Sequence, residues 1–193
     1  MTSELLFTGP ELCKFEAHEV VALLKAREIS SSDLIDAALT RIAQTGPLIN
    51  ATPTLCEARA RAVDLSSRDS TPAGWLAGLP ITIKDLNAVA DVRTTFGTKG
   101  LAGFIPQKSD PLVDQLEQRG AVILGKTNTP EFGAGGNTFN DVFGQTRNPW
   151  NTALNPGGSS GGAAASLAAG EIWLSHGSDH GGSLRTPAAY CGI

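Results

Sequence analysis

Apolar positions recur at helical spacing along the N-terminal part of the chain, with polar side chains between them. The pattern predicts one helix from Cys13 to about Arg27. A second helix follows Ser30, whose hydroxyl suits an N-cap, and is expected to end near Gly46-Pro47. A third, rich in alanine and arginine, is predicted over roughly Leu55 to Leu65. We therefore expect residues 1–70 to form a helical N-terminal region.

The pattern changes after a turn that we predict at Thr71-Pro72-Ala73-Gly74, where short apolar runs of strand length begin. Helical patterns separate these runs. The predicted strands are Leu79–Ile83, Ala121–Leu124 and Ile172–Leu174, and the predicted helices are Pro111–Arg119 and the alanine-rich Gly161–Ala169. Alternating strands and helices indicate an α/β core, a sheet covered by helices, over residues 75–193.

Composition narrows the class of protein. The chain has 193 residues, of which 41% are hydrophobic and 18% charged, as expected for a single domain. A net charge of −4 without any run of Lys or Arg argues against a nucleic-acid partner. The first twelve residues do not resemble a secretion signal, and no apolar stretch is long enough to span a bilayer, so we expect a cytoplasmic protein.

The three cysteines are Cys13, Cys56 and Cys191. Their odd number and wide spacing suit neither a disulfide framework nor a zinc site. We expect reduced cysteines that pack like small apolar residues.

Glycine is enriched between Gly133 and Gly192, and one glycine-rich segment there, NPGGSSGG at 155–162, surrounds two serines. A flexible linker has this composition, but a linker does not normally lie between a Trp-Asn turn and an alanine-rich helix. The segment instead favours a backbone that approaches another group closely. It would present Ser159 and Ser160 at a helix N-terminus, where amide groups point outward.

A second glycine-rich segment, GSDHGGSLRTP, covers residues 177–187. A strand is expected to end near Leu174, and Thr186-Pro187 suits the N-cap and first position of a new helix. Ser183 would then lie on a tight strand-to-helix turn. Gly181-Gly182 leaves the backbone amides unobstructed, as an oxyanion hole requires, so Ser183 is a candidate nucleophile.

A serine nucleophile needs a base, which is most often histidine. His18 lies in the first predicted helix, where an exposed polar role is expected. His176 and His180, together with Asp179, could form a metal pair or belong to a triad. They lie too near Ser183 along the chain to surround a substrate, so we expect no metal site.

The remaining type of base is a lysine that burial keeps neutral. Lys84 lies at the end of a predicted strand, and Lys126 follows another. The pattern alone does not show which of these two lysines is the base.

Three motifs together, GLPITIKD at 78–85, NPGGSSGG at 155–162 and GSDHGGSLRTPA at 177–188, resemble the amidase signature family closely. They stand in the family's order at similar intervals, and weaker similarity extends over most of the chain. Three separated motifs are far more specific than any one of them. The resemblance implies a mixed twisted β-sheet core covered by helices on both faces, incomplete here at the C-terminus.

The resemblance also implies a catalytic triad. Ser183 would attack the amide carbonyl and carry the acyl group, and Ser159, held by a cis peptide after Gly158, would bridge to Lys84 as the terminal base. The proton of Ser183 would pass to Ser159 as that of Ser159 passes to Lys84, and its return would protonate the leaving amine.

Supporting roles are implied for other residues of the motifs. The oxyanion hole corresponds to the backbone amides of His180, Gly181, Gly182 and Ser183. The loop would be fixed by Asp179 and Arg185, the Lys84–Ser159 pair would be hydrogen-bonded by Ser160, and the substrate cleft would be lined near Gly135 and Gly136. The family pattern has threonine where this chain has His180. The backbone amide survives that change, so we expect it to affect substrate shape only.

A different motif, Gly120–Thr127, satisfies the phosphate-loop expression G-x-x-x-x-G-K-[ST]. The four residues between its glycines should wrap phosphates as a loop, whereas Ala-Val-Ile-Leu is typical of a strand. Asn128-Thr129-Pro130 also interrupts the chain where a helix should begin. We therefore do not expect nucleotide binding.

The function that the resemblance implies is hydrolysis of a small-molecule amide, without metal or cofactor and without a membrane partner. One alternative is the glutaminase (A) subunit of a tRNA-dependent amidotransferase, and another is a non-catalytic, truncated interaction subunit. The chain stops at Gly192-Ile193 directly after a motif, which we interpret as truncation. Formation of a homodimer is left open.

Overall fold

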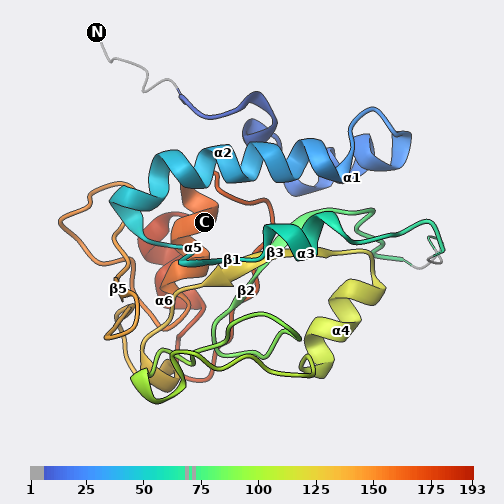
Figure 1. The fold of residues 1–193 in the computed structure, drawn as a ribbon. Coiled ribbons are helices and arrows are strands. Elements are labelled where there is room, and N and C mark those ends of the chain that lie inside the picture. Colours follow the sequence, from blue (N-terminus) through green and yellow to red (C-terminus); the bar gives the residue numbers. More distant parts are fainter. Residues whose placement is uncertain (1–6, 68–69, 71–72) are drawn as a thin grey trace, which may run out of the picture.

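A computed structural model describes residues 7–67, 70 and 73–193 (Figure 1). Its helices are η1 (Glu11–Lys14), α1 (Ala17–Ala26), α2 (Ser31–Ile49), α3 (Glu57–Arg61), η2 (Lys99–Leu101), α4 (Pro111–Gln118), η3 (Glu131–Gly133), α5 (Gly161–Ala168) and α6 (Arg185–Cys191). Its strands are β1 (Thr54–Leu55), β2 (Pro80–Lys84), β3 (Val122–Thr127), β4 (Phe139–Asn140) and β5 (Gly144–Gln145). Of the turn predicted at 71–74, Ala73 and Gly74 form a turn, while Thr71 and Pro72 lie outside the described residues.

The N-terminal helices follow their capping residues. Helix α1 begins only after Glu16, which forms a capping box with Glu19, so the predicted start at Cys13 was wrong. Helix α2 begins after Ser30 as predicted, with Ser30 Oγ accepting from the amide of Asp33 at 3.2 Å. It continues past its predicted end because Pro47 lies in its last turn, and it stops at Asn50, whose φ of 49° is left-handed.

The main sheet has the strand order β1-β3-β2, with β1 antiparallel and β2 parallel to β3. The structure thus confirms the α/β class and the mixed sheet. Strand β3 is longer than the predicted Ala121–Leu124 and takes in Lys126 and Thr127. A phosphate loop is therefore excluded, because its lysine and threonine are part of a fully buried strand.

Helices pack on the sheet through two clusters of buried side chains, and in Figure 1 α2 lies above the sheet while α4 lies below it. One cluster joins β2 and β3 to α1, α2 and α4, and includes Val20, Leu24, Leu34, Ile81, Ile83, Val113 and Ile123. The other joins β3 to α2 and α3, and includes Ile35, Ala38, Ala60, Val122 and Leu124. Both β2 and β3 are buried along their whole length, as expected for strands covered on two faces.

Three other predicted elements differ from the structure. The third helix is reduced to α3, because Thr54 and Leu55 pair with β3 instead. No strand forms over Ile172–Leu174; a single parallel bridge joins the next residue, Ser175, to Thr82. Helix α6 begins at Arg185 rather than after Thr186.

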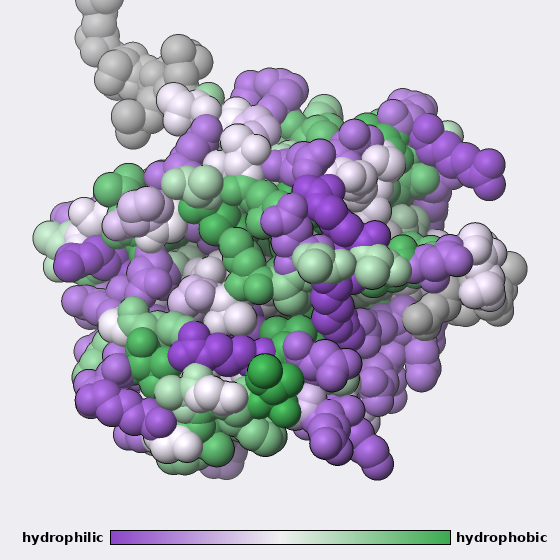
Figure 2. Space-filling model, in the orientation of Figure 1, coloured by the Kyte–Doolittle hydropathy of each residue, from purple (hydrophilic) through white to green (hydrophobic). Residues whose placement is uncertain are grey.

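The described surface mixes hydrophilic and hydrophobic side chains on the face seen in Figure 2. Cys13, Cys56 and Cys191 are free thiols. Within the described ranges no helix is long and apolar enough to cross a membrane.

Candidate active site

The predicted site residues Lys84 and Ser159 meet in the interior of the protein. Lys84 ends β2, and its side chain is fully buried. Its Nζ donates to Ser159 Oγ at 2.7 Å and to Ser160 Oγ at 2.9 Å. Both serines are also buried, with exposed fractions of 2% and 1%. The structure therefore brings the lysine of the first motif into direct contact with both serines of the second, at the N-terminus of α5.

A bulge in the sheet decides where the two rival lysines point. Ile81 pairs with Ile123 but Thr82 pairs with Gly125, so β3 holds one extra residue at this point. Beyond the bulge, Lys126 lies opposite Ile83, the neighbour of Lys84 in β2. Because consecutive residues of a strand face opposite sides, Lys84 and Lys126 project from opposite faces of the sheet.

Lys126 is occupied on its own face of the sheet. Its Nζ donates to Asp85 Oδ1 at 3.0 Å, to the carbonyl of Asn87 at 2.8 Å and to Thr94 Oγ1 at 2.9 Å. Asp85 also accepts from the amide and hydroxyl of Thr95. Lys126 therefore belongs to a buried ion pair away from the serines. Of the two lysines, only Lys84 contacts Ser159 and Ser160.

Burial changes the acidity of Lys84. Desolvation lowers the pKa of Lys84 to about 8, and the negative charge of Asp179 opposes this shift. A lysine with this pKa has a substantial neutral fraction near pH 8, whereas an ordinary lysine has almost none. Lys84 can therefore act as a proton acceptor.

The backbone around Ser159 explains the glycines of its segment. The peptide bond between Gly158 and Ser159 is cis, as the family resemblance implied. A Cβ on Gly158 would lie 2.8 Å from the amide nitrogen of Asn137 and 2.9 Å from the carbonyl carbon of Gly136. Only glycine allows this approach, so the loop that contains Gly135 and Gly136 packs directly against the loop that carries Ser159.

The loop before α6 is organised around Asp179. Its carboxylate accepts hydrogen bonds from the backbone amides of Gly182, Leu184 and Arg185, and it pairs with the Arg185 guanidinium at 3.0 Å. The hydrogen bonds from Arg185 and then these amides hold the pKa of Asp179 well below its usual range. Asp179 and Arg185 thus lie together at the base of the loop that carries Ser183.

The predicted oxyanion amides are not equivalent. In the described part of the chain, the amides of His180, Gly181 and Ser183 donate to no other group. The amide of Gly182 differs from the expectation, because it donates to Asp179 Oδ1 at 2.8 Å. An anion at this loop would therefore find three free donors rather than four.

Ser183 is half-buried and lies next to the other serines. Its carbonyl accepts from the amide of Ser160 at 2.9 Å, which ties the two loops together. No hydrogen bond to Ser183 Oγ is found among the described residues. Contacts of catalytic side chains are often long before substrate binds, so this geometry leaves the predicted link from Ser183 to Ser159 open.

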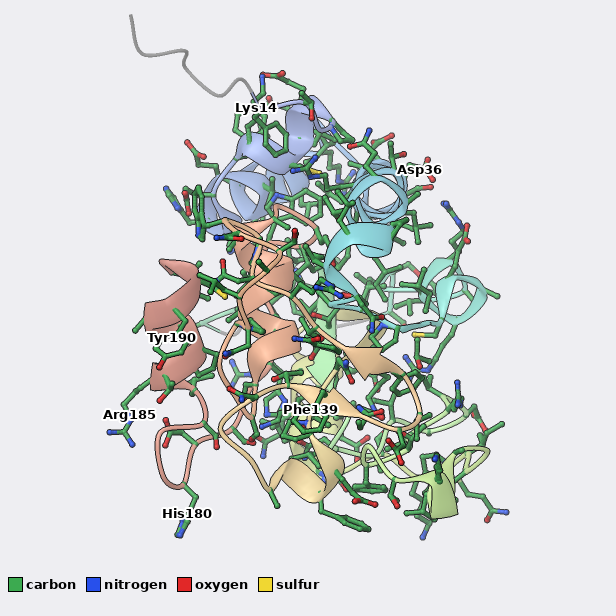
Figure 3. All side chains as sticks on the ribbon, turned by 90° about the vertical axis from the view of Figure 1, so that its left-hand side faces the viewer. Lys14, Asp36, Phe139, His180, Arg185 and Tyr190 are labelled. Carbon is green, nitrogen blue, oxygen red and sulfur yellow. The ribbon has the colours of Figure 1, made fainter. Side chains whose placement is uncertain are left out.

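The histidines do not join this cluster. His180 is exposed and points away from the protein at the tip of its loop (Figure 3). His176 is partly buried; burial first and then the charges of Lys84 and Lys126 lower its pKa. Across residues 7–67, 70 and 73–193, no three His, Cys, Asp or Glu side chains gather as a metal site would require.

A pocket of about 400 Å³ lies beside the Ser159 loop, and the predicted Gly135 and Gly136 line it. Phe139, in β4, also lines this pocket and is 61% exposed. Figure 3 labels its side chain. Gly136, which lines the pocket, packs against Gly158 in the loop that carries Ser159.

Ser178 is a contact of Lys84 that the sequence did not identify. Its hydroxyl accepts from Lys84 Nζ at 3.1 Å. The available signal was its place in the same motif as Asp179 and Ser183. Sequence spacing could not show that its side chain turns toward Lys84.

Comparison with known proteins places the chain in a family. The family model described as Amidase matches residues 33–193. Curated relatives include the glutamyl-tRNA(Gln) amidotransferase A subunit of Anaeromyxobacter dehalogenans, 41% identical over 95% of this chain, and that of Carboxydothermus hydrogenoformans, 44% identical over 95%. The chain spans only 38% and 39% of the length of these relatives.

Solved structures agree. A 6-aminohexanoate cyclic dimer hydrolase superposes with a TM-score of 0.85 at 33% identity, over 93% of this chain and 37% of its own. The glutamyl-tRNA(Gln) amidotransferase A subunit of Thermotoga maritima gives a TM-score of 0.80 at 32% identity, over 94% and 37%. Because the family model covers most of the sequence and these structures share its fold, the chain belongs to the amidase signature family of hydrolases.

Proposed function

We propose that this chain carries the catalytic centre of an amide hydrolase, with Ser183 as nucleophile, Ser159 as bridge and Lys84 as base. The observation that carries the proposal is the contact between the buried Nζ of Lys84 and Ser159 Oγ at 2.7 Å. A buried amine with a pKa of about 8 and a hydroxyl as its nearest partner supports proton transfer rather than a structural ion pair.

The chemistry follows from these positions. Ser183 Oγ forms a bond to the amide carbon while its hydrogen passes to Ser159 and the hydrogen of Ser159 passes to neutral Lys84. The carbon–nitrogen bond then breaks, and the proton returns through Ser159 to the departing amine. Water attacks the remaining ester by the same relay, which releases the acid and restores Ser183.

The loop before α6 supplies the electrostatic part of the mechanism. The carbonyl oxygen becomes negative during attack, and the free amides of His180, Gly181 and Ser183 are the donors available to it. Asp179 and Arg185 hold this loop without touching the reacting atoms. Each donor costs no reorganisation at the moment of reaction, because the carboxylate has already fixed the backbone.

The test is covalent labelling with a fluorophosphonate, followed by peptide mapping, on the protein that contains this chain. Label is expected at Ser183 in the wild type and lost in Ser183→Ala. Lys84→Ala should lose it too, whereas Lys25→Ala, which removes an exposed lysine of α1, should label normally. Label on another residue, or full labelling of Lys84→Ala, would contradict the assignment.

A second candidate is the glutaminase subunit of a tRNA-dependent amidotransferase. The curated relatives at 41% and 44% identity, which carry the name of that subunit, favour it. The two candidates share the same chemistry and differ in the amide and in partners. Hydrolysis of free glutamine together with co-purifying subunits would favour the amidotransferase, whereas turnover of aryl or aliphatic amides by the protein alone would favour a simple amidase.

A further inference from the structure

The hydrogen bonds around Lys84 distinguish its three hydroxyl partners. An ammonium group has three hydrogens to donate, and Lys84 Nζ has three acceptors, Ser159, Ser160 and Ser178, at 2.7, 2.9 and 3.1 Å. The neutral amine has two hydrogens and a lone pair. Loss of a proton from Lys84 therefore leaves one hydroxyl without a donor, and that hydroxyl must donate instead.

Ser160 cannot switch from accepting a hydrogen bond from Lys84 to donating one. Its hydroxyl donates to the carbonyl of Ser178 at 3.1 Å and accepts from the amide of Ser178 at 3.1 Å. Its one hydrogen is thus committed to a backbone carbonyl. Ser160 acts as a fixed acceptor for Lys84 in either protonation state.

Ser159 can switch from accepting a hydrogen bond to donating one to Lys84, but its hydroxyl is shielded from solvent. Ser159 is 2% exposed, and among described residues its hydroxyl hydrogen-bonds to Lys84 alone. It adjoins the loop of Ser183 through the bond between Ser160 and Ser183. Ser159 is therefore the partner on the nucleophile's side of Lys84.

Ser178 differs from both, because it is the exposed member of the set. Its hydroxyl accepts from Lys84, and no second partner is found in the described structure, so its own hydrogen is free to point to water. Its backbone is held by both bonds to Ser160. Ser178 is therefore a rigidly placed hydroxyl between Lys84 and solvent.

We propose that Ser178 is a positioning residue that accepts the third ammonium hydrogen of Lys84 and so sets the pH at which Lys84 becomes a base. This inference rests on the proposed function for its catalytic consequence. Ser178 lies outside the relay from Ser183 through Ser159. It stabilises the charged form of Lys84, and its removal makes the neutral form easier to reach.

The other charges around Lys84 are accounted for by their own contacts. Asp179 favours the charged form, but its carboxylate is bound to its own loop and to Arg185. His176 lies near enough for the charge of Lys84 to lower its pKa. On the opposite face of the sheet, Lys126 is paired with Asp85. Among the described residues none of these charged groups hydrogen-bonds to the Ser178 hydroxyl, so removal of that hydroxyl acts on Lys84 directly.

The direct test is a pH titration of Lys84 Nζ by NMR in protein labelled with ¹⁵N-lysine, with the signal assigned by its loss in Lys84→Arg. Removal of one acceptor from a charged donor in Ser178→Ala should lower the pKa of Lys84 by about one unit. Ser178→Thr keeps the hydroxyl and should restore the wild-type value. Ser175→Ala is the matched control, because Ser175 bonds to Thr82 instead.

An unchanged pKa of Lys84 in folded Ser178→Ala would overturn the inference, as would an equal shift in Ser175→Ala. This titration does not require catalysis. It therefore tests Ser178 even if Ser183 proves unreactive, in which case only the proposed function fails.

The catalytic consequence is tested by the pH dependence of fluorophosphonate labelling at Ser183. Labelling should rise with pH as Lys84 loses its proton, and its midpoint should move about one unit lower in Ser178→Ala and return in Ser178→Thr. A midpoint that stays in place while the pKa of Lys84 moves would overturn the role of Ser178 in setting the base.

Discussion

Lys84 and Lys126 are two fully buried lysines on adjacent strands, yet the protein treats them differently. Lys126 faces a carboxylate, Asp85, in a side-chain pair that is 0% and 1% exposed. Lys84 faces three hydroxyls and contacts no carboxylate among the described residues. The opposite charge of Asp85 favours the protonated form of Lys126, whereas the hydroxyls around Lys84 supply no such charge.

The pKa values of Lys84 and Lys126 are shifted by burial in the same direction, but different groups oppose the shift. Burial lowers the pKa of both lysines. For Lys126 the nearest opposing influence is the charge and hydrogen bond of Asp85, in direct contact. For Lys84 it is the more distant charge of Asp179, which makes no hydrogen bond to it. A buried lysine is therefore a candidate base when its contacts are neutral, and a structural element when they are charged.

The largest expected effect concerns reactivity. Lys84→Met should reduce the labelling rate of Ser183 by about 10³-fold or more, because no other base contacts Ser159 among the described residues. Second-order rate constants for fluorophosphonate labelling would measure this, with circular dichroism to show that the variant is folded. Lys25→Met, on the exposed side of α1, is the control. A loss smaller than about tenfold would remove Lys84 from the mechanism and end the contrast with Lys126.

The next effect concerns stability. Lys126→Met should lower the free energy of unfolding by about 3–5 kcal/mol, because it leaves the carboxylate of Asp85 buried and unpaired. Denaturant titration would measure the loss. The double variant Asp85→Asn with Lys126→Met should recover part of it, since the buried charge is gone. A cost below about 1 kcal/mol would show that the pair is not the structural element described above.

The sequence predicted the parts of the fold that depend on local pattern. Ser30 specified the start of α2, and the alternation of apolar runs gave the α/β class. It failed where tertiary pairing overrides local preference. Leu55 belongs to β1, which pairs with β3, and Ile172–Leu174 forms no strand, because the single bridge to β2 is made by Ser175. It also placed the end of α2 too early, because proline is tolerated in a last turn.

The candidate site was predicted through a resemblance, and the geometry adds what the resemblance could not. The bulge beside Gly125 turns Lys126 away from the serines, and no periodicity in the sequence signals that bulge. The contact of Ser178 with Lys84 joins residues far apart in the chain. The donation of the Gly182 amide to Asp179 depends on a loop conformation that a motif does not specify.

Replacement of Lys84 should change the free energy of unfolding in the opposite direction to replacement of Lys126. Lys84→Met should raise the free energy of unfolding at pH 7 by about 1–3 kcal/mol, because burial of an unpaired ammonium opposes folding. The pKa of Lys84 falls from 10.5 in the unfolded chain to about 8 in the folded one. The unfolded state thus binds more protons between these values, and wild-type stability rises with pH across them.

The gain in Lys84→Met should therefore shrink as pH rises from 8 and vanish above about 10.5. Unfolding titrations of both proteins from about pH 7 to about pH 10 would show this convergence. Destabilisation by Lys84→Met at neutral pH would mean that its three hydroxyl contacts outweigh desolvation, and the two lysines would then be energetically alike.

The smallest effect tests whether Lys126 depends on its charged partner or on its whole set of contacts. Thr94 Oγ1 accepts from Lys126 and donates to the carbonyl of Val92 at 3.1 Å, in a fully buried side chain. Thr94→Val keeps the shape and should cost about 1 kcal/mol, because Asp85 and the carbonyl of Asn87 still hold the ammonium. Thr40→Val, on the exposed face of α2, should change stability by less than about 0.5 kcal/mol.

Labelling of Ser183 should be unaffected in Thr94→Val, since Lys126 and Lys84 project from opposite faces of the sheet. A loss of labelling would mean that the ion pair and the serine cluster form one cooperative unit. If instead Thr94→Val costs as much as Lys126→Met, neutral contacts contribute as much as the carboxylate does. The distinction between a lysine held by charge and a lysine held by hydroxyls would then not explain the proposed role of Lys84 as the base.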